Sequence, residues 1–224
     1  MRVLSEFALL GTNSPRTKAY LQQLAKHHIA PAAVILMEPD VAKMQTEIDQ
    51  YKVGLVEPPE ETPYFRIEEP VLYTLEKYQI PCRVIQTDQV NSQETIAALD
   101  QLPMPFVIYS GFGGQILRSN VFATGKKFLH IHPGVVPDYR GSTTIYYSLL
   151  KENSVGASAI FLNEKIDCGD LIKTKTFPLT HPFPNLDYIF DPHIRSLLLA
   201  EVIEDYLAAG EWRTTPQAVA EGET

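Results

Sequence analysis

Apolar stretches alternate along the chain with amphipathic ones, as expected for strands separated by helices. Residues 3–10 form an apolar run that stops at the turn-forming sequence Gly-Thr-Asn-Ser-Pro at 11–15. Apolar positions then recur at helical spacing over 17–28. Residues 32–37 are continuously apolar, which is typical of a strand buried on both faces. The pattern therefore predicts a strand, a helix and a second strand in this order.

The same alternation continues through the rest of the chain. A helix is predicted to begin at Asn91, with Glu94 in a capping-box position. Further elements are expected in the following order: strands over 106–109 and 128–131, a helix over 143–151, a strand over 155–162, and a last helix capped by Asp191, with Pro192 in its first turn and Gly210 just past its end. Such alternation favours an α/β fold, a Rossmann-like and mostly parallel sheet with helices on both faces, in a single domain.

Two proline-containing segments interrupt this pattern. Residues 57–70 also carry several acidic residues and are expected to form a surface excursion or a lid. Residues 180–192 carry aromatic residues between their prolines and are expected to form an ordered loop. The predicted domain spans 1–212, and residues 213–224 are expected to form a flexible tail.

Composition narrows the class of protein. The chain has 224 residues, 45% of them hydrophobic, and a net charge of −8. A net acidic charge argues against nucleic-acid binding, which needs a concentrated basic face. The sequence contains no run of about 18 apolar residues, so it does not predict a membrane span. The N-terminus lacks the pattern of a signal peptide. The two cysteines, Cys82 and Cys168, form no paired motif, so a reducing cytoplasm is the expected location.

The densest group of reactive side chains lies at the end of a predicted strand. His130 and His132 alternate along it and therefore point to the same side. Such a pair is compatible with metal ligation, with an acid and a hydrogen-bond donor around a reacting carbonyl, or with a purely structural role. Asp167 precedes a glycine-containing turn, where it serves either as an acidic partner or as a simple turn residue.

Three motifs in order resemble a known enzyme family. They are Gly-Gln-Ile-Leu at 114–117, Ile-His-Pro at 131–133 followed by Val-Pro-Asp-Tyr-Arg-Gly at 136–141, and Ile-Asp-Cys-Gly-Asp-Leu-Ile at 166–172. Together they resemble the catalytic core of the formyltetrahydrofolate-dependent formyltransferases. That family includes methionyl-tRNA formyltransferase, glycinamide ribonucleotide formyltransferase and the sugar N-formyltransferases. The resemblance implies the fold of that family and N-formyl transfer as the activity.

The family's catalytic trio is asparagine, histidine and aspartate. The resemblance places the histidine at His132 and the aspartate at Asp167, whereas His130 stands at the asparagine position. In the family, the amide and the protonated histidine stabilise the oxyanion formed when an amine attacks the formyl group. The aspartate supports the histidine charge and relays the proton of the amine. We expect His130 to be a neutral donor, because two adjacent imidazoles disfavour double protonation.

The resemblance also implies two sets of binding residues. The formyl donor, 10-formyltetrahydrofolate, is expected to contact Gly114, Gln115, Ile116, Leu117, Asn163, Glu164, Lys165 and Ile166. The amine acceptor is expected to contact Gly11, Thr12, Asn13, Tyr139 and Arg140. No metal is expected in this interpretation.

The expected acceptor is a small molecule, first of all an amino sugar linked to a nucleotide. Residues 139–141 resemble the sugar and tRNA branches of the family, and few residues follow Gly210, where the tRNA enzyme carries an additional barrel. Three aromatic residues are candidates for stacking on a nucleobase or for a hydrophobic plug, namely Phe183, Tyr188 and Phe190. The family also makes a homodimer an expectation.

Other interpretations stay open. One is formyl transfer to another small amine. A second is a metal-dependent hydrolase that uses His130, His132 and Asp167, joined by His181 or His193. A third is a non-catalytic folate-binding protein, in which His130 has replaced the amide donor.

Overall fold

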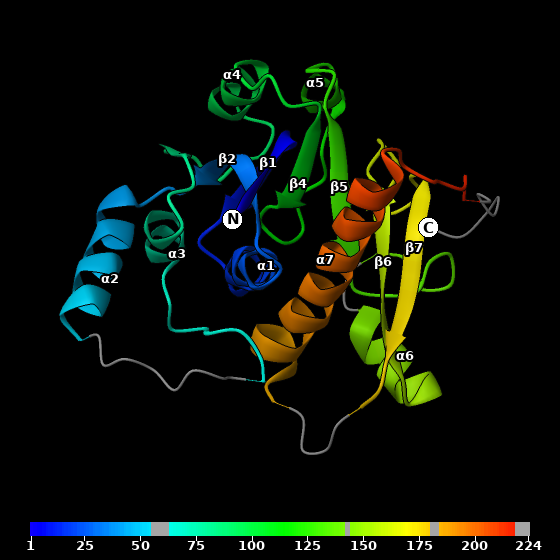
Figure 1. The fold of residues 1–224 in the computed structure, drawn as a ribbon. Helices are drawn as coiled ribbons and strands as arrows, with labels where there is room; N and C mark the ends of the chain where they lie inside the picture. Colours follow the sequence, from blue (N-terminus) through cyan, green and yellow to red (C-terminus); the bar gives the residue numbers. More distant parts are fainter. Residues whose placement is uncertain (55–62, 142–143, 180–183, 218–224) are drawn as a thin grey trace.

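The computed structural model describes residues 1–54, 63–141, 144–179 and 184–217, which contain a seven-stranded sheet of order β3-β2-β1-β4-β5-β6-β7 (Figure 1). In chain order the strands are β1 (Arg2–Thr12), β2 (Ile29–Met37), β3 (Cys82–Ile85), β4 (Phe106–Ser110), β5 (Lys127–His132), β6 (Val155–Phe161) and β7 (Leu171–Phe177). Strands β1 to β5 pair in parallel, whereas β6 and β7 are antiparallel to their neighbours. The predicted mostly parallel α/β fold is confirmed.

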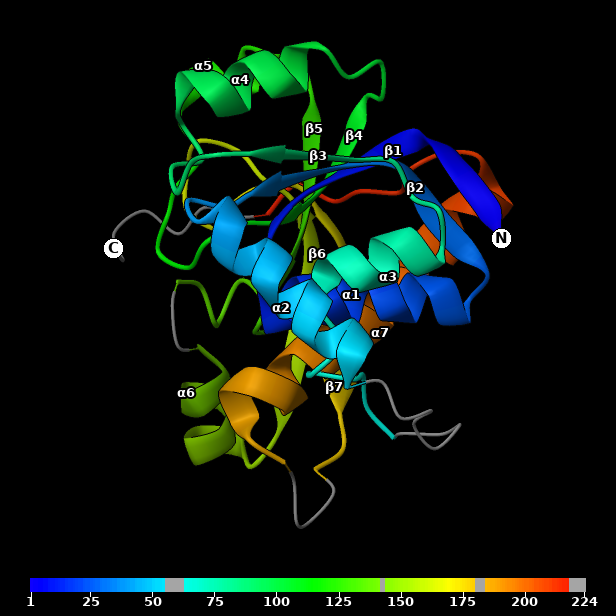
Figure 2. The same ribbon diagram turned by 90° about the vertical axis from the view of Figure 1, so that its left-hand side faces the viewer.

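Helices cover both faces of the sheet. They are α1 (Pro15–Lys26), α2 (Val41–Val53), α3 (Val71–Lys77), α4 (Gln93–Asp100), α5 (Ser119–Phe122), α6 (Thr144–Glu152) and α7 (Asp191–Ala209), with a π-helical turn, η1 (Leu186–Phe190), directly before α7. Figure 2 shows α4 and α5 over one face and α1, α3 and α7 over the other. None of the helices within the described ranges is long and apolar enough to cross a membrane.

Two apolar clusters hold these layers together. One lies between the sheet and the α1, α3 and α7 side, with Leu24 and Leu198 fully buried in it. The other lies under α4 and α5 and contains Leu99 and Phe128. Burial of large side chains on both faces explains why the central strands read as continuously apolar.

Several predicted boundaries need correction. Helix α4 is capped by Ser92, whose side chain accepts a hydrogen bond from the Thr95 N–H, rather than by Asn91. Asp191 is not the cap of the last helix, because η1 runs directly into α7 and Asn185 caps that turn. Elements α2, α3, β3 and β7 were not predicted.

The two proline-containing segments are only partly described. Residues 55–62 and 180–183 lie outside the described residues. The described part of the expected lid, residues 63–70, packs along α1, where Lys18 Nζ donates to the Ile67 carbonyl at 2.6 Å and Phe65 is buried. This part of the segment is therefore a covering of α1.

The flexible tail was predicted to begin at residue 213, which is too early in the chain. Thr215 and Leu171 exchange two backbone hydrogen bonds of 2.8 Å. Gln217 donates to the carbonyls of Asp167 and Gly169 at 3.0 and 2.6 Å. The folded chain therefore extends to Gln217 at least, and residues 218–224 lie outside the described part.

Candidate active site

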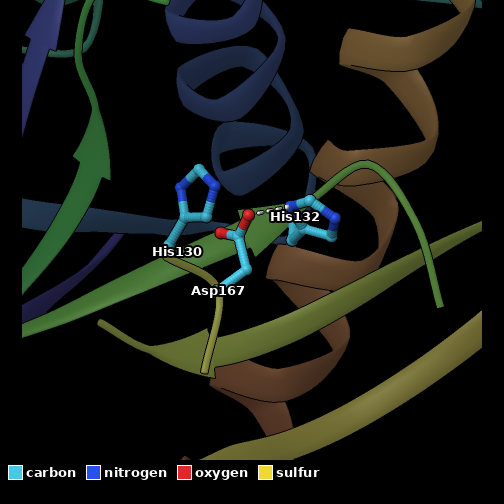
Figure 3. A group of neighbouring side chains, drawn as sticks. All are labelled: His130, His132 and Asp167. Carbon is cyan, nitrogen blue, oxygen red and sulfur yellow. Dashed lines mark ion pairs between the residues drawn. The ribbon is translucent and has the colours of Figure 1, made fainter. Parts of the chain in front are cut away.

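The two histidines lie at the end of β5, where the strand emerges from the sheet. His130 pairs with Ile160 and His132 with Ser158 of β6. Both rings extend to the same side, with centroids 6.4 Å apart, as the alternation predicts (Figure 3). The shared face of the two side chains is thus confirmed.

His132 is held by an acceptor at each ring nitrogen. Its Nδ1 lies 3.3 Å from Asp167 Oδ2, and its Nε2 lies 2.6 Å from the Tyr139 carbonyl oxygen. A carbonyl oxygen only accepts hydrogen bonds, so Nε2 carries a hydrogen. An ionised carboxylate also only accepts, so Nδ1 carries a hydrogen as well. The side chain is 2% exposed. This geometry suits a buried imidazolium whose charge is compensated by Asp167.

The turn that carries Asp167 is shaped by glycines. Asp167 has a φ of 51°, a left-handed conformation that is uncommon outside glycine and asparagine-like residues. A Cβ on Gly169 would lie 1.6 Å from the Phe161 carbonyl oxygen, so only glycine fits there. The Gly141 N–H donates to Asp167 Oδ2 at 3.0 Å. The chain therefore fixes the carboxylate from two sides.

Asp167 stays ionised in this environment. Burial raises the pKa of its carboxyl, but the hydrogen bond and charge of His132, with the Gly141 N–H, outweigh burial and leave the pKa below its usual value. An ionised Asp167 is what a cationic His132 requires.

His130 has the opposite electrostatic environment. Burial first, and then the charges of Arg195, Arg16 and His132, hold the pKa of His130 well below its usual value. Its Nδ1 is buried and has no hydrogen-bond partner within the described residues. His130 is therefore neutral near pH 7, in agreement with the expected neutral donor, whereas its contact with a reacting oxygen remains a prediction.

A cavity of about 310 Å³ opens at the carboxyl ends of β1 and β4, and its lining does not include His130, His132 or Asp167. Thr12 and Asn13 line it, and their contact with an acceptor stays a prediction. Gly11 is not among the lining residues; it lies in β1, where a Cβ would come within 2.9 Å of the Leu9 side chain. Ligands of open α/β sheets bind at this edge.

Two arginines that were not predicted also line this cavity. Arg16 Nε donates to Ser110 Oγ at 3.2 Å, and Arg195 Nε donates to the Ile131 carbonyl, between the two histidines, at 2.7 Å. Arg195 also pairs with Asp191 at 3.1 Å, whereas Arg16 has no salt bridge within the described residues. Burial, and then the charge of Arg195, lowers the pKa of Arg16 to about 10.

A sequence signal for one of them exists. Arg195 lies within a strongly apolar helix, next to Ile194, and an arginine that such a helix buries needs a polar partner. Arg16 gives no such signal, because an arginine in the first turn of a helix is ordinarily a solvated residue.

Tyr139 and Arg140 contact the protein itself in this structure. The Tyr139 ring is buried, its hydroxyl donates to Glu152 Oε1, and its carbonyl orients His132. Arg140 Nη2 donates to Gln217 Oε1 at 2.9 Å. Both residues brace the site, and Gln217, which also was not predicted, links Arg140 to the Asp167 turn. Contact of either residue with an acceptor stays a prediction.

Some residues of the two segments that are expected to bind folate contact the rest of the protein instead. Gln115 Oε1 accepts from the Val90 N–H at 2.8 Å, and Leu117 is buried in the second apolar cluster. In contrast, Ile116 and Ile166 are 49% and 54% exposed. Gly114 has a φ of 76°, and Asn163, Glu164 and Lys165 are exposed. One apolar side chain from each segment is therefore available to a flat ring.

Comparison with known proteins shows to which family the chain belongs. The Formyl transferase family model matches residues 7–183. The chain belongs to the formyl transferase family. Members of this family are transferases of formyl groups and take the formyl group from a folate.

Individual relatives differ in their acceptors. The methionyl-tRNA formyltransferase of Listeria monocytogenes is 29% identical over 139 residues, which are 60% of this chain and 43% of that protein. The chain thus matches less than half the length of this relative. The fold is similar to a phosphoribosylglycinamide formyltransferase from Anaplasma phagocytophilum, with a TM-score of 0.62, 14% identity and coverage of 97% and 94% of the two chains. It is also similar to a sugar N-formyltransferase from Shewanella sp., with a TM-score of 0.57, 16% identity and coverage of 97% and 75%.

Proposed function

We propose that the protein transfers a formyl group from 10-formyltetrahydrofolate to the amine of a small acceptor, an amino sugar linked to a nucleotide. The observation that carries this proposal is the position of His132 between Asp167 and the Tyr139 carbonyl. An imidazolium at a strand end, held by two acceptors, is suited to stabilise a negative oxygen.

Each residue of the cluster has its own role in this proposal. Asp167 keeps the charge on His132 and takes up the proton that the attacking amine releases. His130 donates a neutral N–H to the oxygen on which charge develops. The low pKa of His130 serves this role, because the donor then keeps the same protonation state throughout the neutral range.

The donor segments fit a folate through their exposed apolar side chains. Ile116 and Ile166 offer apolar surface from the two segments that the motifs single out. When bound, the folate supplies the formyl group. The side chains of this chain orient it and limit the access of water to the transferring carbon.

The cavity favours an acceptor with an anionic group. Arg16 and Arg195 place two guanidinium groups against one cavity, and guanidinium binds phosphate or carboxylate oxygens with paired hydrogen bonds. Tyr188 also lines the cavity and is 58% exposed, so it is available to stack on a base. Phe190 is buried in the core and cannot take this role, and Phe183 lies outside the described residues.

The names of similar structures are compatible with this choice. They include a sugar N-formyltransferase from Shewanella sp. and a 4-N formyltransferase from Francisella tularensis. The net charge of −8 supports a small acceptor rather than a nucleic acid or a membrane surface. A homodimer and a cytoplasmic location complete the proposal.

The test is a transfer assay with purified protein in the presence of a chelator. Nucleoside-diphosphate-linked amino sugars, glycinamide ribonucleotide and methionyl-tRNA are supplied separately with 10-formyltetrahydrofolate. Release of tetrahydrofolate is followed by absorbance, and the formyl group on the acceptor by mass spectrometry. Asp167→Asn should abolish transfer, whereas Asp170→Asn, a matched change at an exposed neighbour, should not. Transfer to none of these acceptors, or full activity of Asp167→Asn, would refute the proposal.

A further inference from the structure

The catalytic cluster contains more ligand atoms than formyl transfer needs. One ring nitrogen of His130, one of His132 and one carboxylate oxygen of Asp167 lie within 4.8 Å of one another. We propose that these three side chains form a binding site for a divalent transition-metal ion of the zinc class, and that metal binding switches formyl transfer off. The second half of this statement rests on the proposed function, whereas the first half does not.

The spacing of two ligands already suits a tetrahedral ion. With bonds of about 2.0–2.2 Å to nitrogen and oxygen, neighbouring ligand atoms of a tetrahedral zinc lie about 3.3–3.5 Å apart. His132 Nδ1 and Asp167 Oδ2 are 3.3 Å apart. A metal ion therefore fits between them without a shift of the backbone, and only the third nitrogen has to approach.

Hydrogen bonds orient the first two ligands. His132 directs Nε2 to the Tyr139 carbonyl at 2.6 Å, which leaves Nδ1 as the nitrogen that faces the cluster. Asp167 accepts from the Gly141 N–H. Metal-binding histidines usually donate their second N–H to a carbonyl or carboxylate, and ligating carboxylates are themselves hydrogen-bonded. The cluster has this arrangement in place.

The third ligand comes from His130. Figure 3 shows Asp167 between the two rings, so an imidazole at position 130 completes the group from the opposite side. The buried Nδ1 of His130 has no hydrogen-bond partner within the described residues. One of its ring nitrogens already lies within 4.8 Å of the ligand atoms of His132 and Asp167. An amide nitrogen at the same position has no lone pair to offer a metal.

The donor set determines the class of ion. Two imidazoles with one carboxylate favour Zn²⁺, Co²⁺ and related ions over Mg²⁺ and Ca²⁺, which prefer oxygen ligands. Three protein ligands leave a fourth position for a water molecule. In the bound state the metal takes the Nδ1 lone pair of His132, which holds the proton in the proposed transfer. A metal ion and formyl transfer therefore exclude each other.

The experiment measures metal binding without reference to turnover. The full chain is stripped with a chelator, dialysed and titrated with Zn²⁺ by calorimetry, and with Co²⁺ by its visible absorption. We expect one ion per chain and a four-coordinate Co²⁺ spectrum. His130→Asn should weaken binding by at least about 100-fold, because the loss of an outer partner alone costs 10- to 100-fold. Asp167→Asn should weaken binding in the same way.

His193→Asn is the matched control. The His193 ring packs against Tyr64 at 5.0 Å and is not part of the cluster, so this variant should bind metal as the wild type does. The absence of saturable 1:1 binding overturns the proposal. So does a wild-type affinity in His130→Asn, which would place the ion elsewhere. Thermal melts of each variant confirm folding, and the Asp167→Asn result decides the case if His130→Asn does not fold.

Transfer assays separate the two halves of the proposal. In the presence of chelator the protein should be active, and Zn²⁺ should inhibit it with the midpoint found by calorimetry. Metal binding without any transfer activity would refute the proposed function and leave the metal site standing. Formyl transfer that requires the metal would overturn the switch and leave the metal site standing.

Discussion

Replacement of His130 by alanine, asparagine and glutamine would show whether its ring donates to the reacting oxygen. Alanine removes the donor, asparagine places an amide nitrogen where Nδ1 stands, and glutamine reaches the position of Nε2. Nδ1 is the buried ring nitrogen without a partner among the described residues. We therefore expect asparagine, and not glutamine, to replace the histidine.

The magnitude follows from the role of such donors. Loss of one hydrogen-bond donor from an oxyanion site costs about 2.7–4 kcal/mol, which is a 10²- to 10³-fold loss in kcat. His130→Ala should fall in this range with little change in KM, because the interaction develops only in the transition state. His130→Asn should remain within about tenfold of the wild type, since an amide is a donor of similar strength. The pH profile should not change in His130→Asn, because His130 is already neutral near pH 7.

Initial rates at saturating donor and acceptor, with chelator present, provide the assay. His193→Ala serves as the control for the loss of a half-buried imidazole away from the cluster. A wild-type kcat in His130→Ala would refute the role of His130 as a donor. A full loss in both His130→Ala and His130→Asn would show that the ring acts through a property that an amide lacks, such as metal ligation or proton transfer.

Three further predictions address the turn, the cavity and the stability. Gly169→Ala should lower kcat by about 10²-fold, as expected for a misplacement of about 1 Å, because the new Cβ would lie 1.6 Å from the Phe161 carbonyl oxygen and must displace the Asp167 turn. Gly54→Ala, whose Cβ would meet only ordinary contacts, is the control. Wild-type kinetics in Gly169→Ala would contradict this prediction. Arg195→Met should raise the KM for an anionic acceptor by about 10- to 100-fold, because a charge-assisted hydrogen bond is lost. The KM for an uncharged amine should not change. Equal effects on both acceptors would exclude an anion site. Burial, and then the charge of Lys26, lowers the pKa of His193 from 6.5 to about 4. The unfolded chain therefore binds the extra proton first, and stability should decline as the pH falls from about 6.5 to about 4. Thermal melts should show a smaller decline in His193→Gln, and identical pH slopes would refute the assignment.

The central strands and the histidine pair could be predicted because their signals are local. The strand 32–37 shows its burial on both faces directly in its composition, and His130 and His132 share a face whatever surrounds them. Strand β7 (Leu171–Phe177) gives no such signal, because it pairs with a single neighbouring strand and carries exposed polar residues. The antiparallel direction of β6 likewise has no signal in its own residues, because a strand that follows a helix is ordinarily parallel to the strand before it.

The supports of the site could not be predicted, because they join segments that are distant in sequence. Gln217 contacts Arg140 and the Asp167 turn across separations of 77 and 50 residues, and Arg195 reaches the carbonyl between the histidines across 64. Polarity alone indicates a solvated tail for Gln217. Only the antiparallel pairing of Thr215 with Leu171 brings this residue beneath the turn.

The chemistry of position 130 follows from what surrounds it. Burial first, and then the positive charges of Arg195, Arg16 and His132, lower the pKa of this side chain and favour a neutral imidazole. A neutral imidazole has one N–H and one lone pair, so it offers a donor to an oxyanion in one tautomer and a ligand to a metal in the other. An asparagine amide nitrogen offers only the donor. The neutral imidazole that suits the proposed donor role therefore also leaves a nitrogen lone pair within reach of His132 and Asp167. The two proposed roles can be separated by a residue that keeps the N–H and lacks the nitrogen lone pair.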